Sequence, residues 1–439
     1  MRVFLDFLGC RLNEAELEQW RRDFVARGHH IAARPEDADV CVLNTCAVTT
    51  EAARQSRQVV RRLHRRNPQA AIVVAGCDAT YERERLASLE GVALVLPNRE
   101  KDALVERVVH TLDGRPPARP PALDAESRYL FPHSRTRAFL KVQDGCNNRC
   151  TFCVVRILRG EERSRPVEEI VQEIHTLLRL GYREVVLTGV HLGGYGRDLG
   201  YSLESLVRDI LAETRVERLR LSSLEPWDIP NTFFDLWAES EGRLMPHLHL
   251  PLQSGSDTTL KRMGRRYTTA EYRSLVRRAR ERIPHLTVTT DIIVGFPGET
   301  EEEFQQTLAF VEEMAFAHIH IFTYSPREGT PATKLPHPVP SQVKKDRSRR
   351  LHRLMFHLKA RHLASQVGLV RPVLWEDVLE RGEDTWTWSG LTDNYLRVRA
   401  TVPRAWDLHN RITPTRLERV EAGQYLIGHI LTWEEEHRP

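Results

Sequence analysis

The sequence contains no apolar stretch long enough to cross a membrane. A membrane-spanning helix needs about 18 or more consecutive apolar residues, and no such run occurs. The chain also passes from Arg2 straight into a strand-like segment, where a secretory leader would carry an apolar core. We therefore expect a cytoplasmic protein with no membrane partner.

Cysteine is scarce, with seven in 439 residues. An odd number does not suit a set of paired disulfides, and three of the cysteines lie within the short stretch 146–153. Such clustering is typical of metal ligation in a reducing compartment. The placement of the cysteines is therefore more informative than their number.

A strong excess of either charge is also absent. Lys and Arg number 64 against 60 Asp and Glu, and the sequence pI is about 8.7. Several arginine-dense stretches nevertheless allow a polyanionic partner. A hydrophobic fraction of 41% is ordinary for a globular protein. The length predicts two or three domains.

The first 113 residues alternate short apolar runs with helical patterns. We predict strands at 3–8, 40–44, 71–75 and 92–96 and helices at 14–27, 51–66 and 81–89. This alternation indicates an α/β domain with a Rossmann-like parallel sheet. A proline-rich segment, 114–121, cannot continue either kind of element, so we interpret 114–134 as a linker.

A second strand–helix rhythm runs through residues 135–364. We predict strands at 138–142, 184–188, 218–221, 247–252, 287–294 and 318–322. Six such units indicate a partial (β/α)6 barrel whose working residues follow the strand ends. Short β-rich runs at 373–379, 396–400 and 425–431 then predict a small closed β-barrel over 365–434.

Three cysteines directly follow the first predicted barrel strand in a CxxxCxxC arrangement, Cys146, Cys150 and Cys153. A cubane cluster has four irons, so three thiolates leave one iron open. An open iron can bind the amino and carboxylate groups of S-adenosylmethionine (SAM) and pass an electron to its sulfonium. A structural zinc site is the alternative, but closed zinc sites take four ligands, usually in CxxC pairs.

Three further cysteines, Cys10, Cys46 and Cys77, each follow a predicted strand of the first domain. The C-terminal ends of parallel strands lie along one edge of a sheet, so these residues can converge there. Three thiolates at that edge would hold a second iron–sulfur cluster. A single cysteine beside a strand is usually a small core residue, and we interpret Cys41, inside its strand, in this way.

These cysteine motifs carry a family resemblance. CxxxCxxC after the first strand of a partial barrel resembles the radical SAM superfamily. Together with GCRLNE at 9–14, NTCAVT at 44–49, Gly76-Cys77 and RGEERSR at 159–165, it resembles the methylthiotransferases over about residues 1–433. The resemblance implies two 4Fe-4S clusters and two SAM molecules per turnover. One SAM methylates a sulfur at the auxiliary cluster and the other gives the 5′-deoxyadenosyl radical. An electron donor protein and a sulfur source are then also required.

Further stretches are most similar to the MtaB-type branch, which acts on threonylcarbamoyladenosine beside the anticodon of tRNA. They are NTCAVT at 44–49, SRQVVRR at 56–62, TGVHLGGYG at 188–196 and SSLEP at 222–226. The resemblance implies transfer of a methylthio group to C2 of that adenine. The alternatives within the family are isopentenyladenosine in tRNA and an aspartate of a ribosomal protein.

Several loop residues are candidates for cofactor or substrate contact. Gly189 and Gly295 end predicted barrel strands, where a missing Cβ lets a ligand approach the backbone. By similarity to the superfamily they would meet the methionine amino group and the adenine of SAM. Glu225 and Gln253 also follow strand ends and could hold ribose or carboxylate, although polar loop residues are as often solvated. Arg163 and Arg165 could clamp a carboxylate or phosphate, or form a surface pair.

The last seventy residues favour an RNA partner. They resemble a TRAM domain in position and β-rich character, and Arg397, Arg399 and Arg404 with Tyr395 and Trp406 offer charge and stacking surfaces. The basic helical run 344–362 adds charge, although such a run is more often a solvated face. A non-catalytic, zinc-stabilised RNA-binding protein is the alternative from another class.

Overall fold

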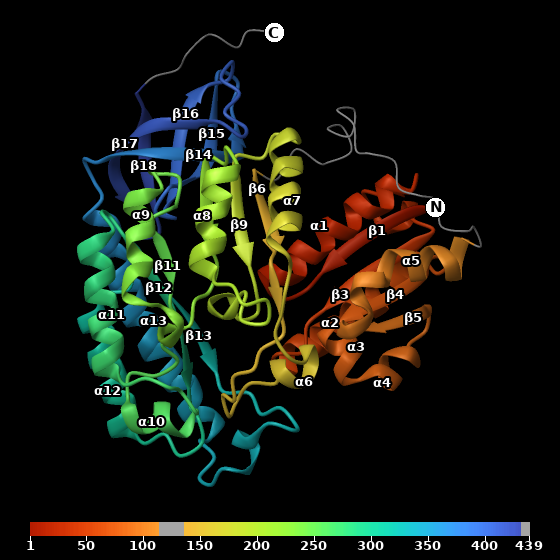
Figure 1. Cartoon of the computed structure of the whole chain (residues 1–439), viewed down its shortest axis with the longest axis horizontal. Coiled ribbons are helices and arrows are strands. Elements are labelled where there is room, and N and C mark those ends of the chain that lie inside the picture. Colours follow the sequence, from red (N-terminus) through yellow and green to blue (C-terminus); the bar gives the residue numbers. More distant parts are fainter. Residues whose placement is uncertain (114–135, 432–439) are drawn as a thin grey trace.

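The computed structural model describes residues 1–113 and 136–431. The predicted linker, 114–134, therefore lies outside the described residues. Three units follow one another along the chain: a parallel-sheet unit, a set of six barrel strands and a small closed β-barrel (Figure 1). The described helices include none that is long and apolar enough to span a membrane.

The N-terminal unit contains one sheet of five parallel strands in the order β2-β1-β3-β4-β5. Its strands are β1 (Arg2–Phe7), β2 (His30–Ile31), β3 (Val40–Thr45), β4 (Ala71–Gly76) and β5 (Val92–Pro97). The four predicted strands are present within one or two residues. Strand β2 was missed because two residues carry no periodic pattern.

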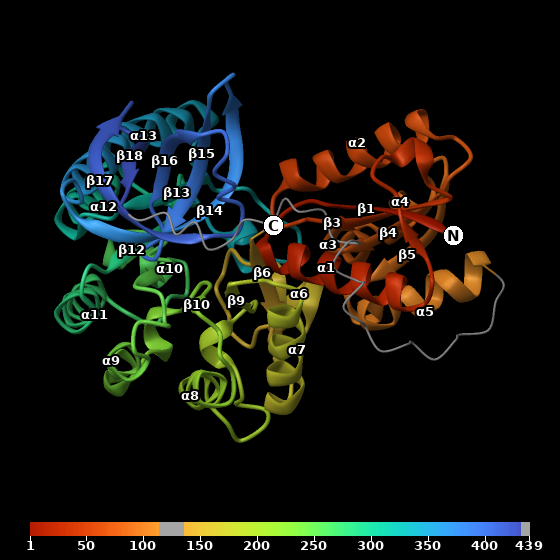
Figure 2. The same cartoon turned by 90° about the horizontal axis from the view of Figure 1, so that it is seen from above.

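Helices cover both faces of this sheet, as seen from above in Figure 2. Helices α1 (Arg11–Ala26) and α5 (Leu104–Val108) pack on one face, and α2 (Thr50–Arg66) and α4 (Arg83–Ala87) on the other. The predicted helix 81–89 is wrong in detail, because α3 (Cys77–Tyr81) ends before a non-helical Glu82 and α4 then starts afresh.

The six predicted barrel strands are present and parallel. They are β6 (Arg137–Lys141), β9 (Glu184–Thr188), β10 (Arg218–Leu221), β11 (His247–His249), β12 (Thr287–Val294) and β13 (His318–Thr323). Strand β11 is shorter than the predicted 247–252, because the backbone leaves the ladder after His249 and only Gln253 bridges back to Ile292.

These strands form two three-stranded ladders, β10-β9-β6 and β11-β12-β13, joined by isolated bridges such as Leu219 to Leu244. Their outer face packs on helices that include α7 (Val167–Arg179), α8 (Leu203–Glu213), α11 (Thr269–Arg282), α12 (Glu301–Met314) and α13 (Ser341–Ala364). Within the described ranges β6 and β13 do not pair, so the barrel is partial.

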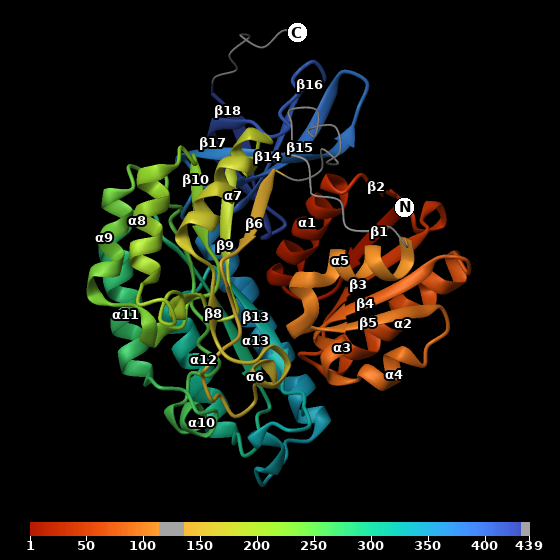
Figure 3. The ribbon, with the colours of Figure 1, turned by 45° about the vertical axis from the view of Figure 1, so that its right-hand side comes forward.

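The open side of the barrel beside β6 is covered by the N-terminal unit. Ala15 of α1 packs against Phe139 of β6 and Val186 of β9 in a small buried cluster. Figure 3 shows α1 next to β6 at the boundary between the two units. The two predicted cysteine sites therefore belong to units that pack directly on each other.

The C-terminal unit is a closed five-stranded barrel in the order β14-β15-β16-β18-β17. Its strands are β14 (Val370–Arg381), β15 (Thr385–Thr392), β16 (Arg397–Pro403), β17 (Ile412–Glu421) and β18 (Tyr425–Ile430). It closes the N-terminal end of the barrel strands: Arg137 donates to Glu376 at 2.9 Å, and Tyr395 stacks on His247 with ring centroids 4.5 Å apart.

Candidate functional site

The structure places Cys10, Cys46 and Cys77 at one edge of the N-terminal sheet. Cys10 caps α1 after β1, Cys46 directly follows β3, and Cys77 begins α3 after β4. Because β1, β3 and β4 are neighbours, the three residues converge as the sequence predicted. The thiols of Cys10 and Cys77 are both close enough to act electrostatically on that of Cys46.

Glycine is required at position 9 for this convergence. Gly9 has φ +103°, and a Cβ there would lie 2.7 Å from the Cβ and 2.8 Å from the Sγ of Cys46. Burial raises the pKa of the Cys46 thiol to about 12. A thiolate at this position therefore needs a compensating positive charge, as a metal cluster would supply.

The second cysteine loop is closed at its base by a short antiparallel pair, β7 (Gln143–Asp144) and β8 (Arg163–Ser164). A Cβ at Gly145 (φ +73°) would lie 1.8 Å from the carbonyl oxygen of Glu161, so only glycine fits this crossing. The charges of Cys146 and Cys150 both act on Cys153, and burial raises its pKa to about 12. The second set therefore offers the same donors as the first, three cysteine thiols that lie close together.

Arg265 is a charged partner of the second set that the sequence did not single out. Its Nη1 lies 3.5 Å from the Sγ of Cys150, and its guanidinium also pairs with Glu225. It is buried between Trp227 and Tyr267. Among 64 basic residues nothing local distinguished it, because its partners come from distant loops.

The two sets of cysteines are neighbours across the boundary between the units. Cys77 packs in one apolar cluster with Val154, which follows Cys153, and with Leu158. The side-chain amide of Asn98 donates to the carbonyl of Leu158 at 2.9 Å and lies 3.5 Å from the Sγ of Cys77. One amide group thus links the surroundings of both sets.

A buried ion network lies beside the first set. Arg159, at the end of α6 (Val155–Arg159), donates to Glu16 at 3.1 Å, to Asp144 at 2.9 Å and to Asn13 at 2.8 Å. The network also holds Lys101, 2.5 Å from Glu16, and Lys141, 3.6 Å from Glu16. Three cations thus face Glu16, Asp144 and the exposed Asp102, which lies 3.3 Å from Lys141. The charges of Cys77 and Cys10 also act on Arg159, so its guanidinium is placed to balance anionic sulfur.

The four residues predicted to contact SAM lie on loops at barrel strand ends. Glu225 is held by Arg265 beside Cys150, and Gln253 is buried with φ +68°. A Cβ at Gly189 would lie 2.9 Å from Gln143 Oε1, and one at Gly295 would lie 2.4 Å from Cγ of Lys344. Close packing already accounts for both glycines, and the SAM contacts stay predictions.

The two arginines predicted to bind substrate differ in their surroundings. Arg165 donates to Glu173 at 2.8 Å and to the carbonyl of Lys141 at 2.9 Å. Arg163 has a half-exposed side chain, with Asp144 3.9 Å away. Arg163 is thus the freer of the two to meet a ligand, and the substrate contact of both stays a prediction.

A buried histidine stands next to the second cysteine loop. His191 pairs with Glu162 at 2.6 Å and with Asp228, and Glu162 accepts from the backbone N–H of Asn147 at 3.0 Å. Burial opposes the charged form of the ring, but the two carboxylates hold the pKa of His191 above its usual value. This arrangement fixes the loop that carries Cys146 against the strand ends.

Polar side chains line the inner face of β11, β12 and β13. His249 lies 3.2 Å from Asp291, its ring is 5.6 Å from that of His320, and its Nδ1 is 2.9 Å from Thr289 Oγ1. The charge of Arg11, next to Cys10, acts on His320 from the N-terminal unit. Alternation placed these residues on strands, but only the register brings them together.

Two family models match the chain. The model of the radical SAM superfamily matches residues 140–311, and that of uncharacterized protein family UPF0004 matches residues 2–97. The first match contains Cys146, Cys150 and Cys153, and the second contains Cys10, Cys46 and Cys77.

Similar proteins extend over nearly the whole chain. A threonylcarbamoyladenosine tRNA methylthiotransferase MtaB of Bacillus subtilis is 37% identical, covering 89% of this chain and 88% of its own, and that of Thermotoga maritima is 35% identical, covering 93% of each. A tRNA-2-methylthio-N(6)-dimethylallyladenosine synthase of Geobacillus kaustophilus is 32% identical over 97% of this chain and 85% of its own.

A solved structure shares the fold. The radical S-adenosylmethionine methyltransferase TsrM from Kitasatospora setae aligns with TM-score 0.53 and 16% identity, covering 74% of this chain and 77% of its own. Identity above 30% over most of the length to curated methylthiotransferases shows the family. This chain therefore belongs to the MtaB-type radical SAM methylthiotransferases, enzymes that use S-adenosylmethionine and an iron–sulfur cluster.

Proposed function

We propose that this enzyme transfers a methylthio group to C2 of the adenine of threonylcarbamoyladenosine, next to the anticodon of tRNA. The observation that carries the proposal is the pair of cysteine sets, each with three thiols, packed against each other across one boundary. The MtaB relatives support the substrate, because their printed names specify it.

Each set has the donors for one 4Fe-4S cluster: Cys10, Cys46 and Cys77 for the auxiliary cluster, and Cys146, Cys150 and Cys153 for the barrel cluster. When bound, the clusters and SAM would supply the sulfur, the methyl group and the 5′-deoxyadenosyl radical. An electron donor and a sulfur source must then serve the enzyme.

The protein's own groups would orient and balance these cofactors. Arg159 and Lys101 place positive charge beside the auxiliary set, and Arg265 does so beside the barrel set. Asn98 donates toward the sulfur of Cys77. Hydrogen bonds and charges of this kind stabilise anionic sulfur and tune cluster potentials. The closed barrel β14–β18 resembles a TRAM domain in its β-rich character and its place in the sequence, and it would bind RNA.

The test is anaerobic reconstitution followed by nucleoside mass spectrometry. The expected product is the methylthio derivative of threonylcarbamoyladenosine in tRNA. Parallel reactions with isopentenyladenosine tRNA and a ribosomal protein separate the other family substrates. Absence of a methylthio product from every substrate, with both clusters intact, would reject the function.

Metal analysis tests the zinc alternative. The ligand atoms of Cys146, Glu162 and His191 lie within 4.8 Å of one another, a donor set that zinc could also use. We expect about eight irons per chain, with matching sulfide. Zinc without iron would instead indicate a non-catalytic RNA-binding protein.

Cysteine substitutions should divide the two half-reactions. Changing Cys10, Cys46 or Cys77 to Ala should leave 5′-deoxyadenosine formation and abolish methylthio transfer, because only the auxiliary donors are lost. Changing Cys146, Cys150 or Cys153 should abolish both products. Equal loss of both activities in the first group, with the barrel cluster still visible by spectroscopy, would contradict this division.

A further inference from the structure

Helix α2 carries two kinds of arginine. Of its six, Arg54 pairs with Glu51 at 2.5 Å, Arg57 with Glu82 at 3.1 Å and Arg66 with Glu36 at 2.5 Å. The other three form no ion pair within the described ranges; they are Arg61, Arg62 and Arg65. The charge of Arg62 does act on Asp6, but that carboxyl is partly buried and accepts the N–H of Phe7 at 2.8 Å.

These three arginines lie on one stripe of the helix. Together with Gln58 they occupy positions i, i+3, i+4 and i+7, which face the same direction on an α-helix. All four side chains are exposed. Like charges four residues apart, as at Arg61 and Arg65, disfavour an isolated helix. Exposure to water would reduce the repulsion between these arginines. It does not explain why, within the described ranges, these three form no ion pair while the other three arginines of α2 each do.

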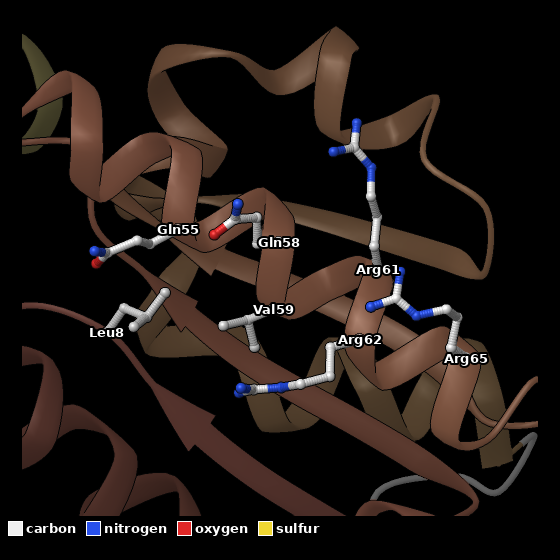
Figure 4. A pocket seen from close by; sticks show the side chains of 7 residues that line it. All are labelled: Leu8, Gln55, Gln58, Val59, Arg61, Arg62 and Arg65. Atoms are coloured by element: carbon white, nitrogen blue, oxygen red, sulfur yellow. The ribbon is translucent and has the colours of Figure 1, made fainter.

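The stripe borders a hollow of about 550 Å³ on the surface (Figure 4). Val59 and Leu8 give it an apolar side, and Gln55 and Gln58 add amide groups to those of the arginines. Guanidinium groups bind phosphate oxygens in pairs, and amides bind phosphate or sugar hydroxyls. The lining thus suits a sugar–phosphate backbone.

The helix starts at the rim of the catalytic region. Thr50, its first residue and four positions after Cys46, donates its backbone N–H to Ser325 Oγ at 3.2 Å, just after β13. At 1.5 Å per residue, the stripe lies roughly 15 to 25 Å from that start. Figure 2 shows α2 and the C-terminal barrel in the same upper half of the view.

We propose that the hollow lined by Arg61, Arg62 and Arg65 binds the phosphate backbone of the anticodon arm of tRNA while the base to be modified lies near the cysteine sets. This inference rests on the proposed function and names a contact surface for its substrate. It gives the N-terminal unit a part in RNA binding alongside the C-terminal barrel.

The test measures binding of an unmodified anticodon stem-loop RNA to the full-length holoenzyme at several salt concentrations. The variant R61Q/R62Q/R65Q removes the three unpaired arginines. The matched control R34Q/R54Q/R66Q removes the same charge from the same unit, but from arginines paired with Asp37, Glu51 and Glu36. Thermal unfolding and RNA-free 5′-deoxyadenosine formation verify that both variants are folded.

We expect the first variant to bind RNA at least tenfold more weakly at low salt. The slope of log affinity against log salt should fall by about 2 to 3, because each of the three lost phosphate contacts removes about 0.7 to 0.9 from it. The control should stay within about threefold of the unchanged enzyme and keep its slope. Equal weakening in both variants, or an unchanged slope in the first, overturns the proposal.

Two further outcomes distinguish RNA binding in the hollow from binding of an electron-donor protein there and from a failure of the proposed function. If the first variant binds RNA normally but is reduced more slowly by an acidic electron-donor protein, the hollow serves that protein and the RNA proposal fails. If the enzyme binds RNA through the hollow but forms no methylthio product on any tRNA, the proposed function fails while the hollow remains an RNA site.

Discussion

At the scale of single residues, Arg159 is a side chain on which several buried partners depend for their hydrogen bonds. Its guanidinium is buried and bonded to Glu16, Asp144 and Asn13, two of which belong to the N-terminal unit. Removing one member of a buried ion network leaves its partners charged and unsolvated, which costs about 3 to 5 kcal/mol. Arg159 therefore joins two units as well as balancing charge near the cysteines.

Arg159→Met should lower the free energy of unfolding by about 3 kcal/mol or more. Arg163→Met is the matched control, because this neighbour has a half-exposed side chain with Asp144 3.9 Å away, and it should cost about 1 kcal/mol or less. Urea denaturation of the metal-free chains measures both. Equal stability of the two variants would show that the network contributes nothing net.

At the scale of elements, β9 and β10 are joined by a buried charge cluster as well as by their ladder. Glu184 of β9 accepts from Arg220 at 2.7 Å and lies 3.0 Å from Arg218. Burial alone would raise the pKa of Glu184, but these guanidinium groups lower it to about 2. The carboxylate therefore stabilises the fold only while it is ionised.

The pH dependence of stability should reflect this depressed pKa. The contribution is fully present above the ordinary pKa of 4.5 and is lost as pH falls toward about 2. A shift of this size corresponds to about 3 kcal/mol. Urea unfolding between pH 5 and pH 3 should show a steeper loss for the unchanged chain than for Glu184→Gln. Glu217→Gln, a surface carboxylate 3.5 Å from Arg183, should keep the steep profile.

At the scale of the whole molecule, the C-terminal barrel β14–β18 supplies hydrogen-bond acceptors for buried arginines of the partial barrel. Arg137 and Arg218 start β6 and β10, and Arg220 lies two residues further along β10. They donate to Glu376, to the carbonyl of Leu391 and to the carbonyl of Asp393, respectively. These partners all lie in the last unit. The barrel interior would otherwise contain three buried cations with a single carboxylate, Glu184.

A chain shortened to residues 1–364 should therefore unfold at least about 5 °C below the full chain, in addition to losing RNA affinity. The cause is the loss of acceptors for the three arginines. Calorimetry of both proteins measures the shift, and Glu376→Gln in the full chain should reproduce part of it. A shortened chain with an unchanged unfolding temperature would show that the last unit does not stabilise the rest of the fold.

The sequence alone predicted the three units and the six cysteines, because both depend on local patterns. Strand periodicity, the CxxxCxxC spacing and the position of Cys10, Cys46 and Cys77 after strands can each be read within a few residues. Because the strands before them are parallel neighbours, Cys10, Cys46 and Cys77 then lie at one edge of the sheet. The split at Glu82 and the two-residue β2 were missed, because tertiary contacts and not periodicity set them.

Only the tertiary structure determined which charges face one another. Each of these contacts joins residues that are far apart in the chain: Arg159 with Glu16, Arg265 with Glu225, and His249 with Asp291. No local sequence pattern therefore marks them. The same holds for the contrast on α2, where six similar arginines differ only in whether a carboxylate lies nearby. The place of each cysteine after its strand can be read from the sequence, because it depends on neighbouring residues. The charged groups around those cysteines come from separate units, so they depend on how the units pack together.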